Sequence, residues 1–449
     1  MSRIAIVSLL SWPLLFTASA VGHAGTIVVG AGAPNDVSTP ETTRVVDGSV
    51  VASQSFWRAG RIITRSQVRA DDGTEVTFEQ IGGSVDEISM IQFPGQAVPM
   101  AGDRVSLLVA ENTPASGQRA VEMIDVLYIA ERADPGQAAD DLTAKFVRTT
   151  NSWSVPLFWK NSCIFIAYNS AGTSHLAGDD EFAIMDSVFQ VWEDATAGRT
   201  FLTFELEGKT DLDTDGSDRV NVISFREDLW GPAGCDAPMS EIRCYNPNAA
   251  AITTVSFLNT KAGKDRAGEI IDADIEFNAK DFAVSANGVT EADPNECKSD
   301  LANTLTHEVG HLMGLDHTCV GSGFTPGEDP EGNPKPWPVD DRGNDVPFCN
   351  DPDLPAEIID STMNAFQSCG ETIKASPAQD DIDAVAGVYP LADDPGVCAI
   401  PDEPVTRRLA CVCQLGASDD GGPLGPLLPL AFTGLGVLMY LRRSVKIDR

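Results

Sequence analysis

The chain has 449 residues, more than one hydrophobic core usually organises, so we expect two folded domains together with processed ends. Its formal net charge of -35 and pI near 4.3 create a field that repels polyphosphates and anionic headgroups. The composition therefore argues against nucleic-acid binding and against binding to an anionic membrane surface. A well-solvated acidic surface is the simpler interpretation.

Residues 1–24 are typical of a secretory signal peptide. Arg3 precedes an apolar run at residues 4–16, and the small residues Ala20 and Ala24 offer cleavage positions. The alternative is an anchor that stays attached, but the run is shorter than the roughly 20 residues that a spanning helix needs. The sequence therefore predicts an exported protein.

Residues 25–140 are expected to form a small all-β domain. The β-like runs TIVVGAG, RIITRSQV, TEVTFEQIG and RVSLLVAE are separated by clusters of glycine, aspartate, asparagine and proline. We expect a sandwich or barrel, followed by an acidic linker at Glu131–Asp141.

Residues 146–398 show the pattern of a second domain with both strands and helices. A helix is expected where apolar residues recur at helical spacing, at Phe182, Met185, Val188, Phe189 and Trp192. Strands are expected at Ser154–Trp159, Ile164–Tyr168, Arg219–Phe225, Ile252–Asn259 and Glu269–Asn278.

The last of these strands alternates apolar and acidic residues. We expect it to be half-exposed, with Asp272, Asp274 and Glu276 on the solvent face. A long segment rich in proline, glycine and aspartate, Val320–Pro355, is expected to lack regular structure.

Ten cysteines in an exported chain indicate disulfides rather than free thiols. Eight of them lie from Cys163 to Cys398, and Cys235 and Cys244 are close enough in sequence to close a local loop. Eight cysteines allow on the order of a hundred pairings, so the sequence leaves the connectivity open.

Three of the five histidines lie within eleven residues, in the run LTHEVGHLMGLDH. His307 and His311 are four residues apart, so both imidazoles lie on one helix face and can share a zinc ion at about 2.0 to 2.1 Å. Gly314 can adopt a left-handed conformation that ends the helix, so that the chain returns and supplies His317 as a third ligand. Unrelated surface or core histidines are the alternative, but three at ligand spacing favour Zn²⁺, with the fourth position left for water.

Glu308 follows the first of these histidines and cannot share its helix face, but it can reach a water molecule beside the metal. There it would act as general base and then pass the proton to a leaving amine. Because zinc lowers the pKa of bound water to about 7, a carboxylate can complete the deprotonation near neutral pH.

The run HEVGHLMGLDH matches HExxHxxGxxH, the long consensus of the metzincin zinc peptidases, and DSTMNAF resembles the Met-turn beneath the zinc in those enzymes. The resemblance spans roughly residues 146–390 and points to the matrixin branch. It implies that Glu308 is the general base and that Met363 is a structural floor rather than a ligand. It also implies the zinc ligands His307, His311 and His317.

The resemblance also implies a fold, an α/β (α+β) zincin-like domain with a mostly parallel twisted sheet and an active-site helix. DGSDRVNVISF, GEIIDADIEFN and SPAQDDIDAVAGVYP resemble, in turn, the strand leading into the cleft, the substrate-flanking edge strand and the closing helix of matrixins. An extended peptide would bind along that edge strand by β-augmentation. The β-rich segment before it resembles modules found ahead of exported bacterial peptidases.

Three departures from the matrixin pattern stand out. Thr318 follows the third histidine where matrixins usually have serine. About 45 residues separate that histidine from the Met-turn, so we expect Val320–Asp360 to cover or reshape the primed-side pocket. No cysteine precedes Cys163, so a pro-segment thiolate on the zinc is absent, and Cys244 lies inside the catalytic region and is no substitute.

A weaker motif is DLDTDGSD, in which Asp211, Asp213 and Asp215 imitate the start of a calcium loop. Position twelve would be Val222 rather than the bidentate glutamate of an EF-hand, and a hydrated turn is the alternative. Because matrixin-like domains often bind structural calcium, Ca²⁺ is kept as a hypothesis. His175 is interpreted as a surface or packing residue rather than a second zinc ligand.

The C-terminal region has three parts. Residues 399–423 form a polar linker, and 424–441 are almost wholly apolar and are expected to form a short transmembrane or sorting helix that contacts the membrane. Residues 442–449 are basic and would remain in the cytoplasm. The pattern resembles the C-terminal sorting signals of exported Gram-negative bacterial proteins, including a class with a cysteine motif just upstream, here Cys411 and Cys413. A plain tail anchor is the alternative.

The sequence therefore predicts a secreted or surface-tethered zinc endopeptidase that acts on proteins or peptides. The alternative is a zinc-containing surface adhesion protein with little peptidase activity, and a third is a metzincin with a narrow self-processing role. Glu308 discriminates, because a closed structural zinc site has no use for a general base and usually recruits a fourth ligand.

Overall fold

A computed structural model gives the fold of the chain. The described residues are 28–29, 43–93, 98–112, 120–128, 146–237, 242–286, 288, 297–321 and 324–399. The predicted signal peptide, acidic linker, C-terminal apolar segment and basic tail, together with Cys411 and Cys413, lie outside them. All described residues belong to one compact unit. Among them, no helix combines the length and the apolar composition that a membrane crossing requires.

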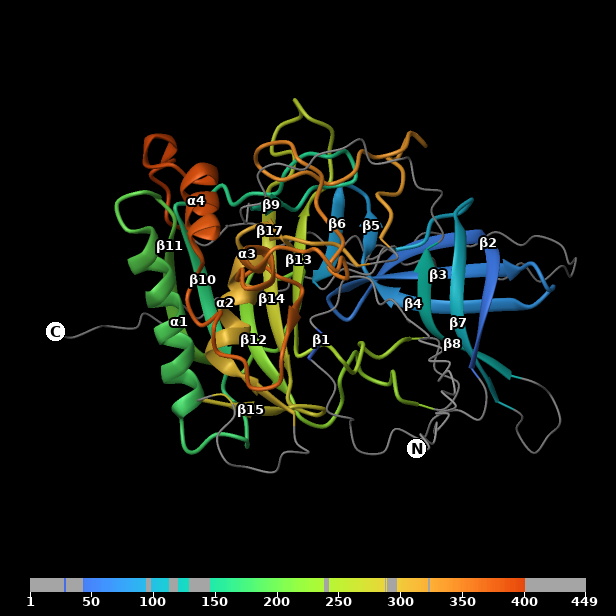
Figure 1. Cartoon of the computed structure of the whole chain (residues 1–449), viewed down its shortest axis with the longest axis horizontal. Coiled ribbons are helices and arrows are strands. Elements are labelled where there is room, and N and C mark those ends of the chain that lie inside the picture. Colours follow the sequence, from blue (N-terminus) through green and yellow to red (C-terminus); the bar gives the residue numbers. More distant parts are fainter. Residues whose placement is uncertain are drawn as a thin grey trace, which may run out of the picture. The chain divides into compact units, whose positions relative to one another are not determined.

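Residues 83–278 contribute a mixed seven-stranded sheet with strand order β11-β10-β12-β14-β13-β6-β5 (Figure 1). The first four strands run parallel, whereas β13, β6 and β5 each run antiparallel to the strand before. The strands are β11 (Thr203–Thr210), β10 (Cys163–Asn169), β12 (Asn221–Arg226), β14 (Ile270–Asn278), β13 (Ala251–Leu258), β6 (Ile88–Phe93) and β5 (Gly83–Val85).

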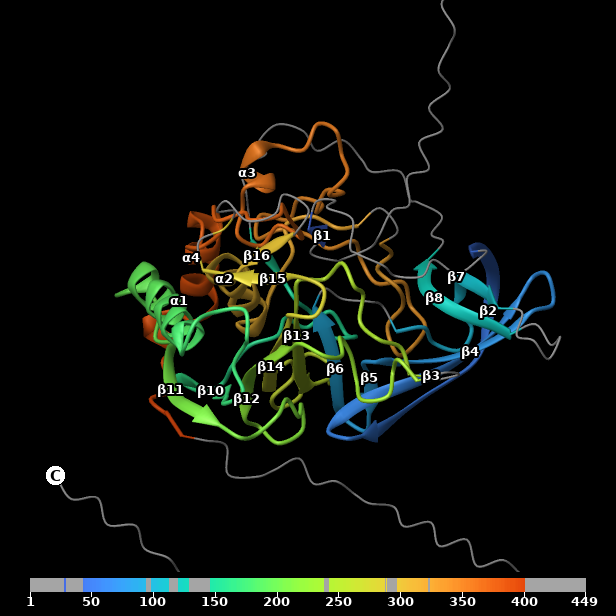
Figure 2. The same cartoon turned by 90° about the horizontal axis from the view of Figure 1, so that it is seen from below.

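Three helices gather on one side of this sheet, as Figure 2 shows. They are α1 (Asp180–Thr196), α2 (Leu301–Leu312) and α4 (Gln379–Val388). The apolar stripe predicted for the first helix is confirmed, because all five of its residues are buried in the main core. A four-residue helix α3 (Ala356–Ile359) and a 3₁₀ turn η1 (Leu391–Asp393) follow later in the chain.

The N-terminal part is rich in strands, as predicted. It forms a five-stranded antiparallel sheet in the order β4-β3-β2-β7-β8, which we call the N-terminal sheet. Alternate residues of these strands, among them Val50, Val68, Phe78 and Leu107, bury one face in a separate small core. The strands are β4 (Glu75–Ile81), β3 (Arg61–Ala70), β2 (Thr43–Arg58), β7 (Arg104–Asn112) and β8 (Ala120–Tyr128).

Three short strand pairs lie outside the two larger sheets. The first, β1 (Val28–Val29) with β18 (Phe366–Gln367), and the second, β15 (Ala283–Ser285) with β16 (Lys298–Asp300), are parallel. The third, β9 (Val147–Arg148) with β17 (Leu315–Asp316), is antiparallel and fixes the chain just after α2.

Two sequence-based strand predictions are wrong. The strand expected at Ser154–Trp159 does not form, because Ser154 has a φ of 59° and Pro156 has no N–H to donate, and isolated bridges take its place. The strand β14 is not half-exposed, because all nine of its residues are buried.

The acidic face of β14 is buried because other parts of the chain cover it. Glu276 forms an ion pair of 2.8 Å with Arg61 of the N-terminal sheet. Asp272 accepts a hydrogen bond from the backbone N–H of Arg219 at 2.6 Å, and Asp274 accepts one from Val222 at 2.9 Å. Nor is β14 an edge strand, because it lies between β12 and β13.

Disulfides are confirmed for the eight cysteines from Cys163 to Cys398, and one of them closes the predicted local loop between Cys235 and Cys244. The other three link Cys163 to Cys398, Cys297 to Cys369, and Cys319 to Cys349. The last closes the long segment that begins at Val320, whose described residues contain isolated bridges such as that between Val320 and Phe348.

Candidate metal centre

Helix α2 carries the predicted zinc-binding run, and both of its ends are held by side chains. At its start, the Asp300 carboxylate accepts a hydrogen bond from the N–H of Asn303 at 2.9 Å. At its end, Trp159 Nε1 donates to the carbonyl of Leu312 at 2.7 Å, and the Tyr389 hydroxyl donates to that of Met313 at 2.8 Å. These bonds satisfy backbone groups that have no partner within the helix.

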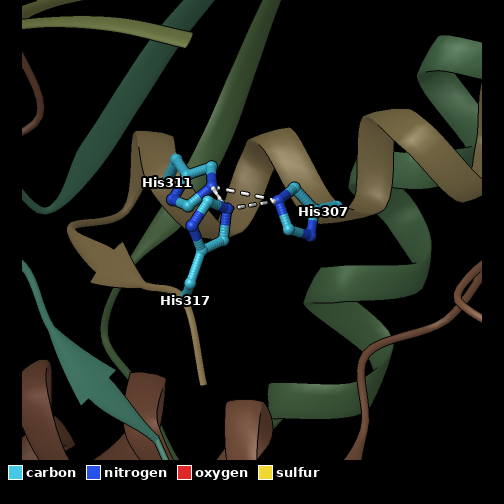
Figure 3. Close-up of side chains that lie close together, drawn as sticks. All are labelled: His307, His311 and His317. Atoms are coloured by element: carbon cyan, nitrogen blue, oxygen red, sulfur yellow. Dashed lines mark hydrogen bonds between the residues drawn. The ribbon is translucent and has the colours of Figure 1, made fainter. Parts of the chain in front are cut away.

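The three predicted ligands come together at one point (Figure 3). The Nε2 atom of His311 lies 3.0 Å from that of His307 and 3.1 Å from that of His317, and the remaining separation is 3.3 Å. Tetrahedral zinc with Zn–N bonds of about 2.0 to 2.1 Å separates its nitrogens by about 3.3 to 3.4 Å. The arrangement therefore fits one metal ion with three histidine ligands.

The opposite ring nitrogens are fixed by backbone carbonyls. His307 Nδ1 lies 2.6 Å from the carbonyl oxygen of Thr362, and His311 Nδ1 lies 2.9 Å from that of Leu315. A carbonyl only accepts, so Nδ1 carries the proton and Nε2 keeps a free lone pair for a metal. Burial lowers the pKa of His311 to about 3 and that of the other two well below the ordinary value, which keeps the imidazoles neutral.

Gly314 makes the turn that delivers the third histidine. Its φ of 88° lies in the left-handed region, and its N–H donates to the carbonyl of His311 at 2.9 Å. A Cβ there would lie 3.0 Å from the carbonyl oxygen of Leu157, so the position also lacks room for a side chain. The chain then pairs through β17 with β9 and reaches His317.

Glu308 is fully buried, and its two carboxylate oxygens differ. Oε2 accepts a hydrogen bond of 2.6 Å from the hydroxyl of Thr253 on β13, whereas Oε1 has no partner. Burial raises the pKa of Glu308 to about 8, although the Thr253 hydrogen bond opposes the rise. A buried carboxylate oxygen without a partner is unfavourable, and a water molecule bound to a metal would satisfy it.

Met363 is 1% exposed and packs against α2 at Gly310, where an added Cβ would overlap its sulfur. Its carbonyl accepts a hydrogen bond of 3.0 Å from the N–H of Thr318. The hydroxyl of Thr318 lies 2.8 Å from that of Ser361, so the threonine connects the third ligand to the turn that contains Met363.

Two residues at the centre escaped the sequence analysis. Thr253 holds Glu308 from β13, but this strand also contains Thr254 and Ser256, so the sequence did not single it out. Phe93 of β6 stacks on the ring of His311, with centroids 4.3 Å apart and planes at 10°. Its distance in sequence from the motif gave no indication of this contact.

The candidate calcium residues have other partners. Asp211 accepts a hydrogen bond of 2.7 Å from Ser170, and Asp213 pairs with Arg226 at 2.8 Å. The carboxylate of Asp215 accepts from the hydroxyl of Ser217 at 2.6 Å. Among the described residues, the three histidines are the one group of three or more potential ligands whose ligand atoms lie within 4.8 Å of one another.

The remaining described histidine, His175, lies outside the metal centre. Its Nδ1 atom accepts a hydrogen bond of 3.1 Å from the backbone N–H of Val284 in β15. This contact agrees with the interpretation of His175 as a packing residue.

Comparisons with known proteins add little to this geometry. No protein-family model and no curated protein matches the chain. Among solved structures, metalloproteinase-II from Bacteroides fragilis is 9% identical, with a TM-score of 0.18, over 62% of this chain and 82% of that one. A TM-score of this size carries no argument about fold or function.

Proposed function

We propose that the protein is an exported zinc-dependent endopeptidase in which His307, His311 and His317 bind the metal and Glu308 is the general base. The proposal rests on one observation. The Nε2 atoms of three neutral imidazoles lie 3.0–3.3 Å apart, and the residue after the first of these histidines is a buried glutamate whose Oε1 has no partner. Three protein ligands and one acid–base group form the pattern of a catalytic zinc site.

Each residue has a distinct task in this mechanism. When bound, zinc would polarise the substrate carbonyl and lower the pKa of the attacking water. The positive charge of bound zinc would lower the pKa of Glu308 from its raised value and so favour the carboxylate. Glu308 would then take the proton from that water through Oε1 and give it to the leaving amine. Thr253 holds the carboxylate in place by donating to Oε2. The two carbonyl-bound Nδ1 atoms keep His307 and His311 oriented toward the metal.

The resemblance to metzincins of the matrixin type supports the same activity, because HEVGHLMGLDH and DSTMNAF contain the zinc-binding consensus and a Met-turn. We place the substrate along β13 rather than β14, because β14 lies between β12 and β13, whereas β13 carries Thr253 beside Glu308 and borders only β6 on its other side. There an extended peptide would bind by β-augmentation. A structural calcium ion at Asp211, Asp213 and Asp215 remains a hypothesis.

Four disulfides support export to an oxidising compartment. In this proposal, residues 1–24 direct secretion, and the apolar segment at 424–441 tethers or sorts the protein at the cell surface. A zinc-containing adhesion protein is the less favoured candidate, since adhesion gives no role to a general base.

Metal analysis of single histidine variants tests the proposal. His311→Ala and His317→Ala should each lose the bound zinc and the ability to hydrolyse a fluorogenic peptide library. Hydrolysis is measured before and after limited trypsin treatment, so that activity requiring proteolytic activation is also detected. His175→Ala is the matched control and should keep both, because His175 lies outside the metal centre. Unchanged zinc stoichiometry in the first two variants would refute the ligand assignment.

A further inference from the structure

We infer that β6 (Ile88–Phe93) is an intramolecular inhibitor that occupies the substrate edge of β13, so that the enzyme is latent until the N-terminal strands leave. The inference rests on the proposed function, and it also identifies the class of substrate. It begins from the seven-stranded sheet, in which β5 and β6, at residues 83–93, continue a sheet whose other five strands lie between residues 163 and 278.

The pairing of β6 covers six of the eight residues of β13. Six residue pairs run antiparallel along β13, from Phe93 opposite Thr253 to Ile88 opposite Leu258. The other side of β13 pairs with β14, and the other side of β6 pairs with β5. A strand has only two hydrogen-bonding edges, so from Thr253 to Leu258 β13 has no edge left for an extended substrate.

The end of β6 also covers the metal centre. Phe93 is 4% exposed, and its ring stacks on His311 at 4.3 Å between centroids. It lies opposite Thr253, the residue that donates to Glu308. The metal centre is therefore covered by the Phe93 ring on the metal-binding residue His311, and no atom of β6 needs to bind the metal.

The side chains of β6 show what kind of peptide fits this edge. Phe93 belongs to the main core with α2, and Ile91 packs against it, whereas Met90 points into a different cluster with Ile62 of the N-terminal sheet. Between them, the Gln92 amide donates to Thr254 at 3.1 Å. By this pattern, the substrates are extended segments with large apolar or aromatic side chains two residues apart.

Release of the N-terminal sheet would not leave the buried Glu276 carboxylate without an ion-pair partner. Its main ionic contact is Arg61, which pairs with Glu276 at 2.8 Å and donates to the hydroxyl of Tyr245 at 2.6 Å. Glu276 has a second partner, Arg226, at 2.6 Å, from its own part of the chain. No cysteine precedes Cys163, so no disulfide can tie residues 1–162 to the rest.

A single cut between β8 and β9 would therefore convert the inhibitor into a separate, dissociable chain. While the connection is intact, β6 acts at the high effective concentration of a tethered ligand. After the cut, dilution favours release. The acidic linker predicted from the sequence at Glu131–Asp141 is chosen for the cut, because it lies between the two strands in sequence and consists of small and polar residues.

The test places a recognition sequence for a specific protease within Glu131–Asp141 of the full chain. Peptide hydrolysis should be low in the intact chain, and it should rise at least tenfold when the cut chain is diluted. A synthetic peptide of residues 83–93 should restore inhibition. Glu308→Gln in the same cut chain is the control and should remain inactive.

A second variant opens the edge without any cut. Phe93→Ala combined with Ile91→Ser weakens the apolar contacts of β6 and should raise hydrolysis by the intact chain at least tenfold. Val45→Ala, at a side chain that is 54% exposed, is the matched control in the N-terminal sheet and should change nothing. Hydrolysis that neither the cut nor this variant raises would overturn the inference.

Hydrogen exchange separates the two proposals. Release of β6 should speed amide exchange in β13 whether or not the protein hydrolyses peptides. Faster exchange without hydrolysis would support the occupied edge and contradict the peptidase assignment. An intact chain already as active as the cut and diluted one would contradict the inhibition and leave the peptidase assignment standing.

Discussion

Gly310 packs against Met363, so the effect of Gly310→Ala on stability should depend on whether Met363 is present. Alanine in the middle of a helix is favoured over glycine by about 1 kcal/mol. At Gly310, however, the new Cβ would overlap the Met363 sulfur and lie 3.0 Å from its Cε, and such overpacking costs about 1–3 kcal/mol. Gly310→Ala should therefore be neutral or destabilising by up to about 2 kcal/mol.

In a Met363→Ala background the same substitution should stabilise. Met363 is 1% exposed, so its truncation leaves a cavity and costs about 2–5 kcal/mol. The alanine methyl at position 310 then enters vacant space, the overlap disappears, and the helix preference of about 1 kcal/mol remains. The coupling energy of the two changes should be about 1–3 kcal/mol.

The coupling is measured by urea unfolding of four zinc-loaded proteins, namely the unchanged protein, the two single variants and the double variant. Competition with a chelator measures their zinc affinity. Gly310→Ala alone should also weaken zinc binding by about 10- to 100-fold, because it displaces the turn whose Thr362 carbonyl orients His307. A Gly310→Ala effect of the same sign and size in both backgrounds would refute the packing argument.

Three further predictions concern other residues. Thr253→Val should lower kcat about 10- to 100-fold with zinc retained, because Glu308 loses the hydroxyl that holds it; unchanged steady-state kinetics would contradict this role. Burial and neighbouring aspartates raise the pKa of Asp272, so its charged form destabilises the fold. At pH values above this pKa, Asp272→Asn should raise Tm, and the gain should shrink as the pH falls below the pKa. A lower Tm of the variant at pH 8 would contradict this prediction. Replacing Cys319 and Cys349 by alanine should cost about 3–4 kcal/mol in chemical unfolding, as expected for opening a loop of this length, and a loss under 1 kcal/mol would show that the segment is held otherwise.

The metal centre was predictable because its geometry is local. Four-residue spacing places His307 and His311 on one helix face, and Gly314 has the φ above zero that the turn to His317 needs. Helix α1 was predictable for the same reason, since its apolar residues repeat with the helical period.

Features that depend on distant residues were not predictable. The alternation in β14 gave the correct strand but the wrong environment, because Arg61, which neutralises Glu276, comes from the other half of the chain. The pairing of β6 with β13 likewise joins residues more than 150 positions apart, and nothing in either strand specifies its partner. Proximity in sequence indicated the Cys235–Cys244 disulfide, whereas the other three join cysteines 30 or more positions apart and follow from the fold.

The role of Glu308 is the central claim, and Glu308→Gln tests it most directly in the cut and diluted chain. Glutamine keeps the size of the side chain and can still accept from Thr253, so the fold and the three histidine ligands should be retained, with full zinc content by metal analysis. It cannot take the proton from water, so kcat for peptide hydrolysis should fall by about 10²- to 10⁴-fold. A variant that binds zinc fully and keeps more than half of the activity would contradict the assignment.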